Sequence, residues 1–469
     1  MQRLKRDMLE RYDIPVHAPG QVRAAMFGLG EALLGVAARL LDAAAPDLGI
    51  ACVPSDAPWT GDGADPAALL REQEGLYTVL ARGYEGETPV NREIVVQSIL
   101  RVTEGREGLW ALAVEPALAL GLLDTECPDP EADLRSAAAL LAARHRAGLP
   151  GLTLLCLGED EGCADRARNR IAALAKDAAG GFGDWLAACE FCPALPDGFV
   201  RRADGKEAAA QCAKMNYADG MLHLAEPYAR LTLRVSEGFR RRWPWDGAAG
   251  IALVDDLGPA CRDKGRYVDA GLFAMAAPGW LLGLEGLSDC MKHERLRRFV
   301  GRTYYDELLP ADPAEREQAA PRVIQAFERF ENPLAGNAIL PCARPLLGRF
   351  RRGALPLIRA AAAEDFEPPR HLAFALAATI MLYAGARRDE KGRYTVARGN
   401  QVHILEDDPA ALAVFATLAH DMPPEALAYA ALADRELWQG EDLRDIDGLE
   451  ARVALDIANL QRQPDFLPE

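Results

Sequence analysis

Arginine side chains recur at spacings that could hold a small anion. Arg349, Arg351 and Arg352 lie close together in the sequence, and residues 240–242 form a second cluster. A guanidinium group can bind a carboxylate through two parallel hydrogen bonds, so these positions favour recognition of an organic acid. A solvated helix face explains the first cluster equally well, and the sequence leaves that choice open.

Lys264, Asp269 and Leu272 could partly converge on one side of a helix, because positions eight or three residues apart lie near one face. A lysine whose charged form is disfavoured by burial can exchange a proton near neutral pH. Proton transfer without redox chemistry is therefore one use of Lys264 and Asp269. The simpler interpretation is a structural ion pair of Asp269 with Lys264 or Arg266, with Leu272 packing in the core.

Composition argues against metal, nucleic acid and membranes. Cys189 and Cys192 have a metal-like spacing, but no second pair or neighbouring histidine accompanies them, so no metal is expected. The net charge of -17 repels phosphate backbones and anionic lipid surfaces, so neither is an expected partner. The 10 cysteines form no dense framework, which is typical of a reducing compartment, and we expect a cytoplasmic protein.

The length of 469 residues predicts two domains, each with its own core. Over residues 1–246, short apolar runs alternate with amphipathic segments, which is the pattern of a doubly wound α/β fold. Residues 247–469 are predicted to form a mainly α-helical domain, because strand signals thin out and helical periodicity takes over. The predicted strands of the first domain cover residues 14–16, 49–53, 108–114 and 152–157.

Helix boundaries in the second domain are marked by proline and capping residues. Asn332 followed by Pro333 predicts the end of a helix. Asp408 followed by Pro409 predicts a cap with proline at the first helical position. One buried helix face is predicted from apolar residues at helical spacing, namely Leu296, Phe299, Val300, Tyr304 and Leu308.

Several motifs resemble one known family. Residues 254–272, which include Lys264, are similar to the stretch around the catalytic lysine of the polyol-specific long-chain dehydrogenases, or mannitol dehydrogenase family. Residues 73–78 (Gln-Glu-Gly-Leu-Tyr-Thr) resemble the family's Gln-Asp-Gly-Leu-Tyr-Thr segment. Within the family, the chain is most similar to the tagaturonate reductase (altronate oxidoreductase) group. Further matching segments follow the family's order over most of the chain, at residues 90–94, 225–227, 329–333 and 355–356.

This resemblance implies a Rossmann-type doubly wound amino-terminal domain, a mainly α-helical carboxyl-terminal domain and an NAD(H) site in the cleft between them. It also implies hydride transfer between nicotinamide and an alcohol or ketone, without metal, with Lys264 as the general base. The family's asparagine and histidine appear here as Asp269 and Leu272. An ionised Asp269 would repel a developing alkoxide, and Leu272 cannot donate a hydrogen bond. The resemblance assigns Lys264 and Asp269 to catalysis, and Arg349 and Arg351 to binding a sugar-acid substrate.

The resemblance also assigns cofactor residues. The family's first strand leads into a Gly-x-Gly-Asn-Phe-x-Arg turn, where the backbone approaches a pyrophosphate at the start of a helix. Placed on residues 17–23, this motif keeps Arg23, displaces its glycine to Gly20 and gains Pro19, which removes a backbone donor. The family's Asn-Thr-Thr-Glu segment ends at Glu115. NAD affinity is therefore expected to be weakened or lost.

Two functions remain in view. The first is an NAD-dependent oxidoreductase of the tagaturonate reductase type, which interconverts a keto sugar acid and its alcohol. The alternative is a catalytically impaired relative that keeps the fold as a binding or partner protein. The departures at Asp269, Leu272 and the glycine turn favour the alternative, whereas the extensive matching scaffold favours the first.

Overall fold

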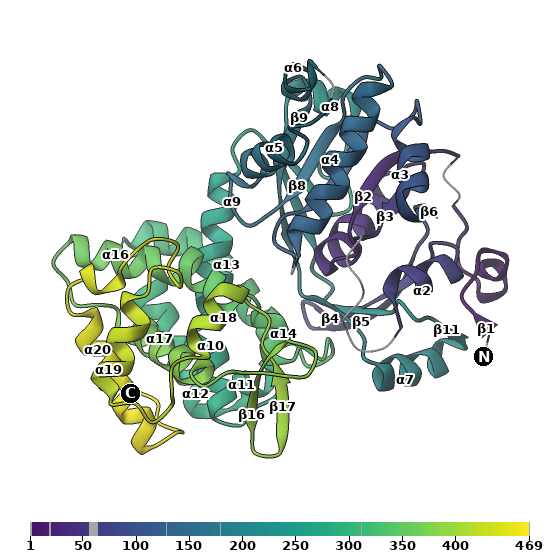
Figure 1. Ribbon diagram of the computed structural model, residues 1–469. Coiled ribbons are helices and arrows are strands. Elements are labelled where there is room, and N and C mark those ends of the chain that lie inside the picture. The colour runs from purple at the N-terminus through teal and green to yellow at the C-terminus, as the bar shows by residue number, and fades with distance from the viewer. Residues whose placement is uncertain are drawn as a thin grey trace. The chain divides into compact units, whose positions relative to one another are not determined.

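The computed structural model describes residues 2–17, 20–55, 64–127, 129–178, 180–310 and 312–468. The chain divides into two compact units, Met1–Cys261 and Arg262–Glu469, called here the N-terminal and C-terminal units (Figure 1). The predicted boundary between residues 246 and 247 precedes strand β14 (Ile251–Val254), which belongs to the main sheet of the N-terminal unit. No helix among the described residues is long and apolar enough to cross a membrane.

An eight-stranded sheet forms the centre of the N-terminal unit. Its order is β14-β13-β9-β8-β7-β2-β3-β6, and β2 (Val22–Phe27) pairs in parallel with β3 on one side and β7 on the other. The strand order reverses at β2, which is the switch point at whose carboxyl edge ligands bind in such sheets. The remaining strands are β3 (Gly49–Val53), β6 (Ile99–Val102), β7 (Leu120–Asp124), β8 (Thr153–Leu157), β9 (Glu190–Asp197) and β13 (Arg230–Arg234).

Helices cover both faces of this sheet, as a doubly wound fold requires. Figure 1 shows α4 (Pro130–Arg146) and α5 (Cys163–Leu174) across one face, where Leu141 and Ile171 are fully buried. The opposite face packs against other elements through a second core that includes Leu41 and Phe239. These elements are η2 (Ala32–Ala38), α1 (Arg39–Ala44) and α8 (Glu237–Arg242), while α3 (Gly105–Ala113) and α6 (Phe182–Ala187) join the first face. The predicted α/β fold class is confirmed.

Two predicted strands are wrong. Residues 14–16 lie outside regular structure, and the first strand of the main sheet is β2 instead. Residues 108–114 belong largely to helix α3, whose buried side chains Leu109, Leu112 and Ala113 follow helical spacing while Trp110 is exposed. The period of about three to four residues, and not the apolar content, decides the element. The strands predicted at residues 49–53 and 152–157 correspond to β3 and β8.

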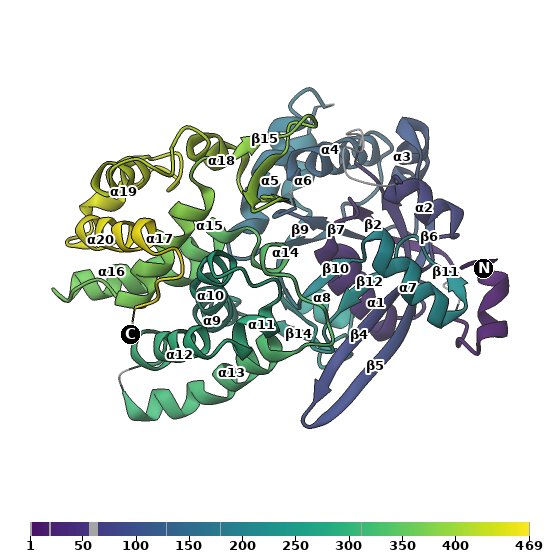
Figure 2. The ribbon, with the colours of Figure 1, turned by 90° about the horizontal axis from the view of Figure 1, so that it is seen from below.

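A smaller sheet packs beside the main one in the N-terminal unit, and it explains several of the family-like motifs. Figure 2 shows its long hairpin of β4 (Tyr77–Glu85) and β5 (Thr88–Val96). The buried Asp219 carboxylate accepts hydrogen bonds from the Gln73 side chain at 2.8 Å and from the Thr78 backbone at 2.6 Å. The motif at residues 73–78 therefore has a structural role. The other elements are β10 (Val200–Arg202), β12 (His223–Ala225), β1 (Gln2–Arg3), β11 (Tyr217–Ala218), η1 (Arg6–Tyr12), α2 (Pro66–Glu72) and α7 (Gly205–Met215).

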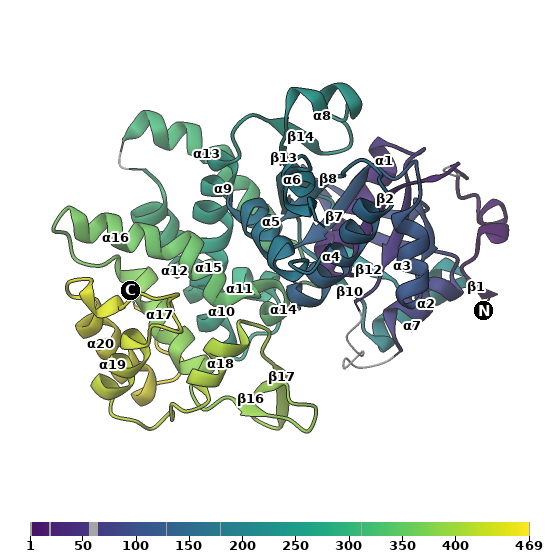
Figure 3. The same cartoon turned by 45° about the horizontal axis from the view of Figure 1, so that its top comes forward.

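The C-terminal unit is mainly helical, as predicted. Its central helix α17 (Arg370–Tyr383) is buried along almost its whole length and packs against α10 (Ala270–Leu281) and α20 (Leu449–Arg462). Figure 3 shows a hairpin of β16 (Tyr394–Arg398) and β17 (Gln401–Ile404) projecting from these helices. The other elements include α11 (Leu287–Lys292), α12 (Glu294–Arg302), η4 (Thr303–Leu308), α13 (Pro313–Glu331), α14 (Ile339–Ala343), α16 (Leu355–Ala363), β15 (Arg387–Arg388), α18 (Pro409–Phe415), α19 (Pro424–Ala433) and η6 (Leu443–Asp445).

Candidate active site

Lys264 and Asp269 begin and end a widened helical turn in the C-terminal unit. Helix α9 (Gly258–Asp263) continues into the π-helical segment η3 (Lys264–Asp269) and then into α10. Each backbone hydrogen bond of a π-helix joins residues five positions apart, so the side chains of Lys264 and Asp269 lie on the same side of the turn. Lys264 Nζ lies 3.5 Å from Asp269 Oδ1, and the side chains are 8% and 1% exposed. The predicted structural ion pair between them is confirmed.

Two arginines from a distant segment complete the cluster around Asp269. Arg349, the last residue of α15 (Leu346–Arg349), forms an ion pair with Asp269 Oδ1. Arg352, on η5 (Phe350–Ala354), places its Nε 3.3 Å from Asp269 Oδ2. Burial disfavours ionisation of Asp269, but the charges of Lys264, Arg349 and Arg352 outweigh it and lower the pKa of that carboxyl. We call these four residues the Asp269 cluster, and its three cations exceed its one anion by two charges.

A glycine lets the two segments of the cluster approach closely. A Cβ atom on Gly353 would clash with the backbone carbonyl oxygen of Gly265, and it would lie 2.6 Å from the backbone nitrogen of Ala270. Only a residue without a side chain therefore fits where η5 packs against η3 and α10. This contact is what places the arginines of residues 349–352 beside Asp269.

The two predicted substrate residues have different surroundings. Arg349 uses its other nitrogen atoms on backbone carbonyls, with Nε 3.0 Å from Ala343 O and Nη2 2.9 Å from Cys342 O. Arg351 donates from Nη1 to Leu437 O at 3.2 Å and is not in contact with Asp269 in any described interaction. The structure thus brings Lys264, Asp269 and Arg349 together with Arg352, and it leaves Arg351 outside the cluster.

Two further sequence interpretations have clear outcomes. Leu272 is fully buried in α10, so the interpretation that it packs in the core is confirmed. Arg266 donates from Nε to the carbonyl oxygen of Leu308, and the described ion pairs of Asp269 are with Lys264, Arg349 and Arg352.

The predicted cofactor residues lie toward the amino ends of the strands. Gly20 precedes β2, while Ala18 and Pro19 of the proposed turn lie outside the described residues. Arg23 is on β2, and its guanidinium carbon lies 4.6 Å from the ring centroid of Trp243. Glu115 follows α3, and its carboxylate lies 4.0 Å from Arg101. Ligands of such sheets bind at the opposite, carboxyl edge. The predicted turn at residues 17–23 is displaced because the strand predicted at residues 14–16 does not form and the first strand of the main sheet is β2.

A Gly-x-Gly turn that the motif placement missed follows β2 directly. Gly28 has φ +89°, and a Cβ atom there would clash with the Asp133 carboxylate. A Cβ atom on Gly30 would lie 3.0 Å from Asp124 Oδ2, and η2 begins two residues later. Glycines at these two positions suit a turn that lets a pyrophosphate approach the backbone at a helix start. The signal was available in the sequence, because the apolar run of residues 22–27 leads straight into Gly-Leu-Gly.

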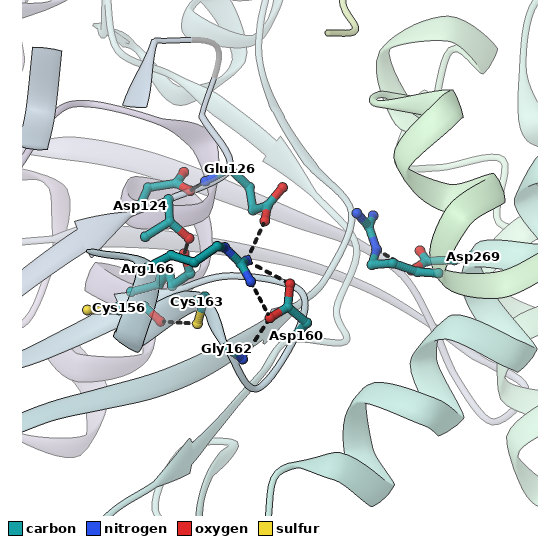
Figure 4. Close-up of polar contacts among 11 residues, drawn as sticks. Asp124, Glu126, Cys156, Asp160, Gly162, Cys163, Arg166 and Asp269 are labelled. Atoms are coloured by element: carbon teal, nitrogen blue, oxygen red, sulfur yellow. Dashed lines mark hydrogen bonds and ion pairs between the residues drawn. The ribbon is translucent and has the colours of Figure 1, made fainter. Parts of the chain in front are cut away.

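Acidic residues follow β7 and β8 at the same edge of the sheet (Figure 4). Asp124 ends β7 and accepts a hydrogen bond from the backbone of Glu126 at 2.9 Å. In the loop after β8, Asp160 binds the guanidinium of Arg166 through two bonds of 2.9 and 2.7 Å. Arg166 also lies 3.9 Å from Glu126.

Burial raises the pKa values of two carboxyl groups beside the Gly28–Gly30 turn, Asp124 and Asp133, toward neutral pH. Desolvation raises the pKa of Asp124 to about 7. It raises the pKa of Asp133, on the first turn of α4, to about 6. Both carboxyl groups contact the Gly28–Gly30 turn, so the charge at this turn depends on their protonation.

A small pocket of about 260 Å³ opens at the carboxyl end of β3, the neighbour of β2. It is lined in part by Ser55, Arg71, Thr103 and Glu104, and the Nε of Arg71 lies 3.1 Å from Glu104 Oε1. No cluster of three or more potential metal ligands occurs among the described residues. Cys189 and Cys192 are buried.

The chain is similar in sequence to several altronate oxidoreductases. No family model matches it. An altronate oxidoreductase of Cronobacter sakazakii is 28% identical over 289 residues, which cover 60% of this chain and 57% of that protein. One of Halalkalibacterium halodurans is 26% identical over 260 residues, or 54% and 50% of the two chains. The chain thus spans about half the length of these relatives in the matched region. That of Bacillus subtilis is 24% identical over 423 residues, 84% of this chain and 83% of that protein.

Solved structures extend the similarity to the fold. The mannitol 2-dehydrogenase of Pseudomonas fluorescens, in ternary complex with NAD and D-mannitol, aligns over 99% of this chain and 98% of its own. Its TM-score is 0.77 at 17% identity. A substrate-free D-sorbitol dehydrogenase aligns with a TM-score of 0.66 at 16% identity, over 99% of each chain. The chain is therefore similar in sequence to the altronate oxidoreductases and has the fold of mannitol 2-dehydrogenase, which confirms the resemblance predicted from its motifs.

Proposed function

We propose that the chain is an NAD-dependent oxidoreductase of the tagaturonate reductase type, which interconverts a keto sugar acid and its alcohol. The observation that carries the proposal is the buried amine of Lys264, held 3.5 Å from Asp269 in a cluster of net positive charge. The similarity to altronate oxidoreductases supplies the substrate class. In this proposal Lys264 gives a proton to the carbonyl oxygen during reduction and takes it from the hydroxyl during oxidation.

The Asp269 cluster supports this chemistry electrostatically. A lone carboxylate about 4 Å from a developing alkoxide would oppose it by about 4 kcal/mol at an effective dielectric constant of about 20. Here Lys264, Arg349 and Arg352 surround that carboxylate, so the net charge of the cluster favours an oxyanion or a substrate carboxylate. We expect turnover to be slower than in relatives with a histidine at the position of Leu272. Loss of one oxyanion donor typically lowers kcat by roughly 10²–10³.

For the cofactor, we propose the Gly28–Gly30 turn in place of Gly20. Gly28 has a positive φ, and Gly28 and Gly30 lie between β2 and η2, where a dinucleotide-binding turn is expected. The carboxyl groups of Asp133 and Asp124 also lie at this turn. When bound, the nicotinamide of NAD(H) supplies or accepts the hydride. The pocket that contains Ser55 and Thr103 lies where such folds hold the adenosine end.

The cellular setting of the proposal is the cytoplasm, with a small sugar acid as the partner molecule. No disulfide bond joins any of the described cysteines, which supports a reducing compartment. The net charge of -17 supports a small-molecule partner over nucleic acid.

A binding titration and a turnover assay test the proposal. NADH is titrated into the purified protein by fluorescence, and its oxidation is then followed with tagaturonate as the substrate. We expect binding, slow turnover, and loss of turnover but not of NADH binding in Lys264→Ala. The matched control is Lys292→Ala, because Lys292 belongs to the same unit but its side chain is 66% exposed.

Three other outcomes would contradict parts of the proposal. Absence of binding at millimolar NADH removes the dehydrogenase proposal. Binding without turnover of any keto sugar acid favours the catalytically impaired relative, for which the replacement of the family's asparagine by the fully paired Asp269 is the specific observation. Turnover that persists in Lys264→Ala removes the assigned role of the lysine.

A further inference from the structure

The carboxyl group of Asp133 faces the glycine turn of the N-terminal unit from the first turn of α4. A Cβ atom on Gly28 would overlap its Oδ2, so the carboxyl lies directly against the backbone of that turn. Asp124 lies at the end of β7, the strand that pairs with β2, and its Oδ2 is 3.0 Å from the position of a Cβ atom on Gly30. Two acidic groups therefore flank the place where a dinucleotide would present its negatively charged pyrophosphate.

Asp133 has hydrogen-bonding capacity that the protein does not use. The residue is 4% exposed, and Oδ2 accepts a hydrogen bond from the thiol of Cys127 at 3.5 Å. Its Oδ1 is buried and has no hydrogen-bond partner in the part of the chain that the structure describes. A buried carboxylate with an unsatisfied oxygen is costly, whereas a neutral carboxyl group can donate a proton to a ligand oxygen.

We propose that binding of the dinucleotide at the Gly28–Gly30 turn is coupled to proton uptake. Asp133 takes up one proton, and Asp124 can take up a second. This inference rests on the proposed function, because it concerns the same cofactor. The proton balance is simple: an ionised carboxylate takes one proton from solvent as the ligand binds, and it returns that proton on release. In the protonated state the carboxyl group is a hydrogen-bond donor to the anion, and in the ionised state it is a repelling charge.

The neighbouring charges all act in one direction. The titratable groups that interact with the two carboxyls come from β3, from the loop after β7 and from the loop after β8. Each of them is acidic or neutral, namely Cys52, Glu126, Cys127, Asp129 and Glu159. Arg166, a cation on α5, is engaged by Asp160 and Glu126. Burial is the main cause that raises the pKa values of Asp124 and Asp133 to about 7 and about 6; the nearby acidic charges add to it, and hydrogen bonds from the Glu126 backbone and the Cys127 thiol oppose it. Proton uptake near neutral pH is therefore possible.

Calorimetric titration of NADH into the full chain measures this coupling. Repeating the titration in two buffers of different ionisation enthalpy gives the number of protons taken up. We expect uptake of about one to two protons per NADH near pH 8, and an affinity that falls about tenfold per pH unit and per proton above pH 7. Asp133→Asn keeps a neutral hydrogen-bonding group, so its proton uptake should fall by about one and its affinity at pH 8 should exceed that of the wild type.

The control is Asp165→Asn, because Asp165 lies on α5 of the same unit with a side chain 68% exposed. It should leave proton uptake unchanged. NADH binding by the wild type without proton uptake and with a flat pH profile overturns the inference and leaves the proposed function intact. No binding of NADH between pH 5.5 and 8.5 overturns both. The wild-type titration decides the matter even where Asp133→Asn fails to fold.

Discussion

Replacing Asp269 by asparagine should destabilise the C-terminal unit strongly. Its carboxylate is 1% exposed, and it lies 3.5 Å from Lys264 Nζ and 3.3 Å from Arg352 Nε, with Arg349 as the third partner. At an effective dielectric constant of about 20, each contact of this length is worth about 5 kcal/mol before desolvation. Because removing one partner of a buried ion pair leaves uncompensated charge, we expect a net loss of about 3–5 kcal/mol in the free energy of unfolding.

Urea unfolding at pH 7 measures this loss, and Glu294→Gln is the matched control. Glu294 pairs with Arg298 at 2.8 Å in the same unit, but its side chain is 86% exposed. A helical pair of this kind contributes roughly 0.3–0.5 kcal/mol. A loss below about 1 kcal/mol in Asp269→Asn would refute the reasoning, because it would mean that the carboxylate is not the buried centre of the cluster.

The pH dependence of this effect has a definite sign. The pKa of Asp269 is lowered by its three cationic partners, although burial opposes this. The stability that it contributes is therefore present above its ordinary pKa of about 4 and is lost as pH falls through its lowered pKa. The difference between wild type and Asp269→Asn should be constant from pH 5 to 8 and shrink in stronger acid. Millimolar phosphate should partly restore the variant, because its three cations then lack an internal anion.

Three further substitutions test the N-terminal unit. Gly28→Ala should lower the free energy of unfolding by about 1–3 kcal/mol and abolish NADH binding. The control is Gly148→Ala, because Gly148 also has a positive φ but open space around it, so only stability should change. Thermal melts and fluorescence titrations compare the two variants. Because the pKa of Asp133 is raised, its contribution to the free energy of unfolding is present at pH 4 and lost as pH rises through about 6. At pH 8, Asp133→Asn should therefore have a free energy of unfolding about 3 kcal/mol higher than the wild type, as measured by urea unfolding. Arg144→Met should lose roughly 3–5 kcal/mol, because the fully buried guanidinium donates to four backbone carbonyls, while the exposed Arg146→Met should change little in the same assay.

Local patterns in the sequence determined the fold class and the helical second half. Caps and periodicity are properties of neighbouring residues, so they survive without any knowledge of packing. Asp408 caps α18 as predicted, and Asn332 is the residue at which α13 ends. The five apolar residues from Leu296 to Leu308 are all buried. The sequence left the partner of Asp269 open between Lys264 and Arg266, and the π-helical turn η3 brings Lys264 to it.

The position of the glycine turn depends on the position of the strand before it. The short apolar run at residues 14–16 predicts a first strand, which places the glycine turn within residues 17–23. The structure has its first sheet strand at Val22–Phe27, which moves the turn to Gly28 and Gly30. Short apolar runs do not distinguish a strand from an irregular segment, because the neighbours that would pair with it are far away in sequence.

Only the tertiary structure decided which charged groups meet. Arg349 and Arg352 contact Asp269 across about eighty residues of chain, whereas Arg351 between them faces Leu437. Asp133 and Asp124 reach the Gly28–Gly30 turn from separate elements. The sequence by itself determined the local helices and the resemblance to a known family. Burial, charge balance and protonation at both sites arise from contacts between distant segments, because they depend on which groups exclude water from one another.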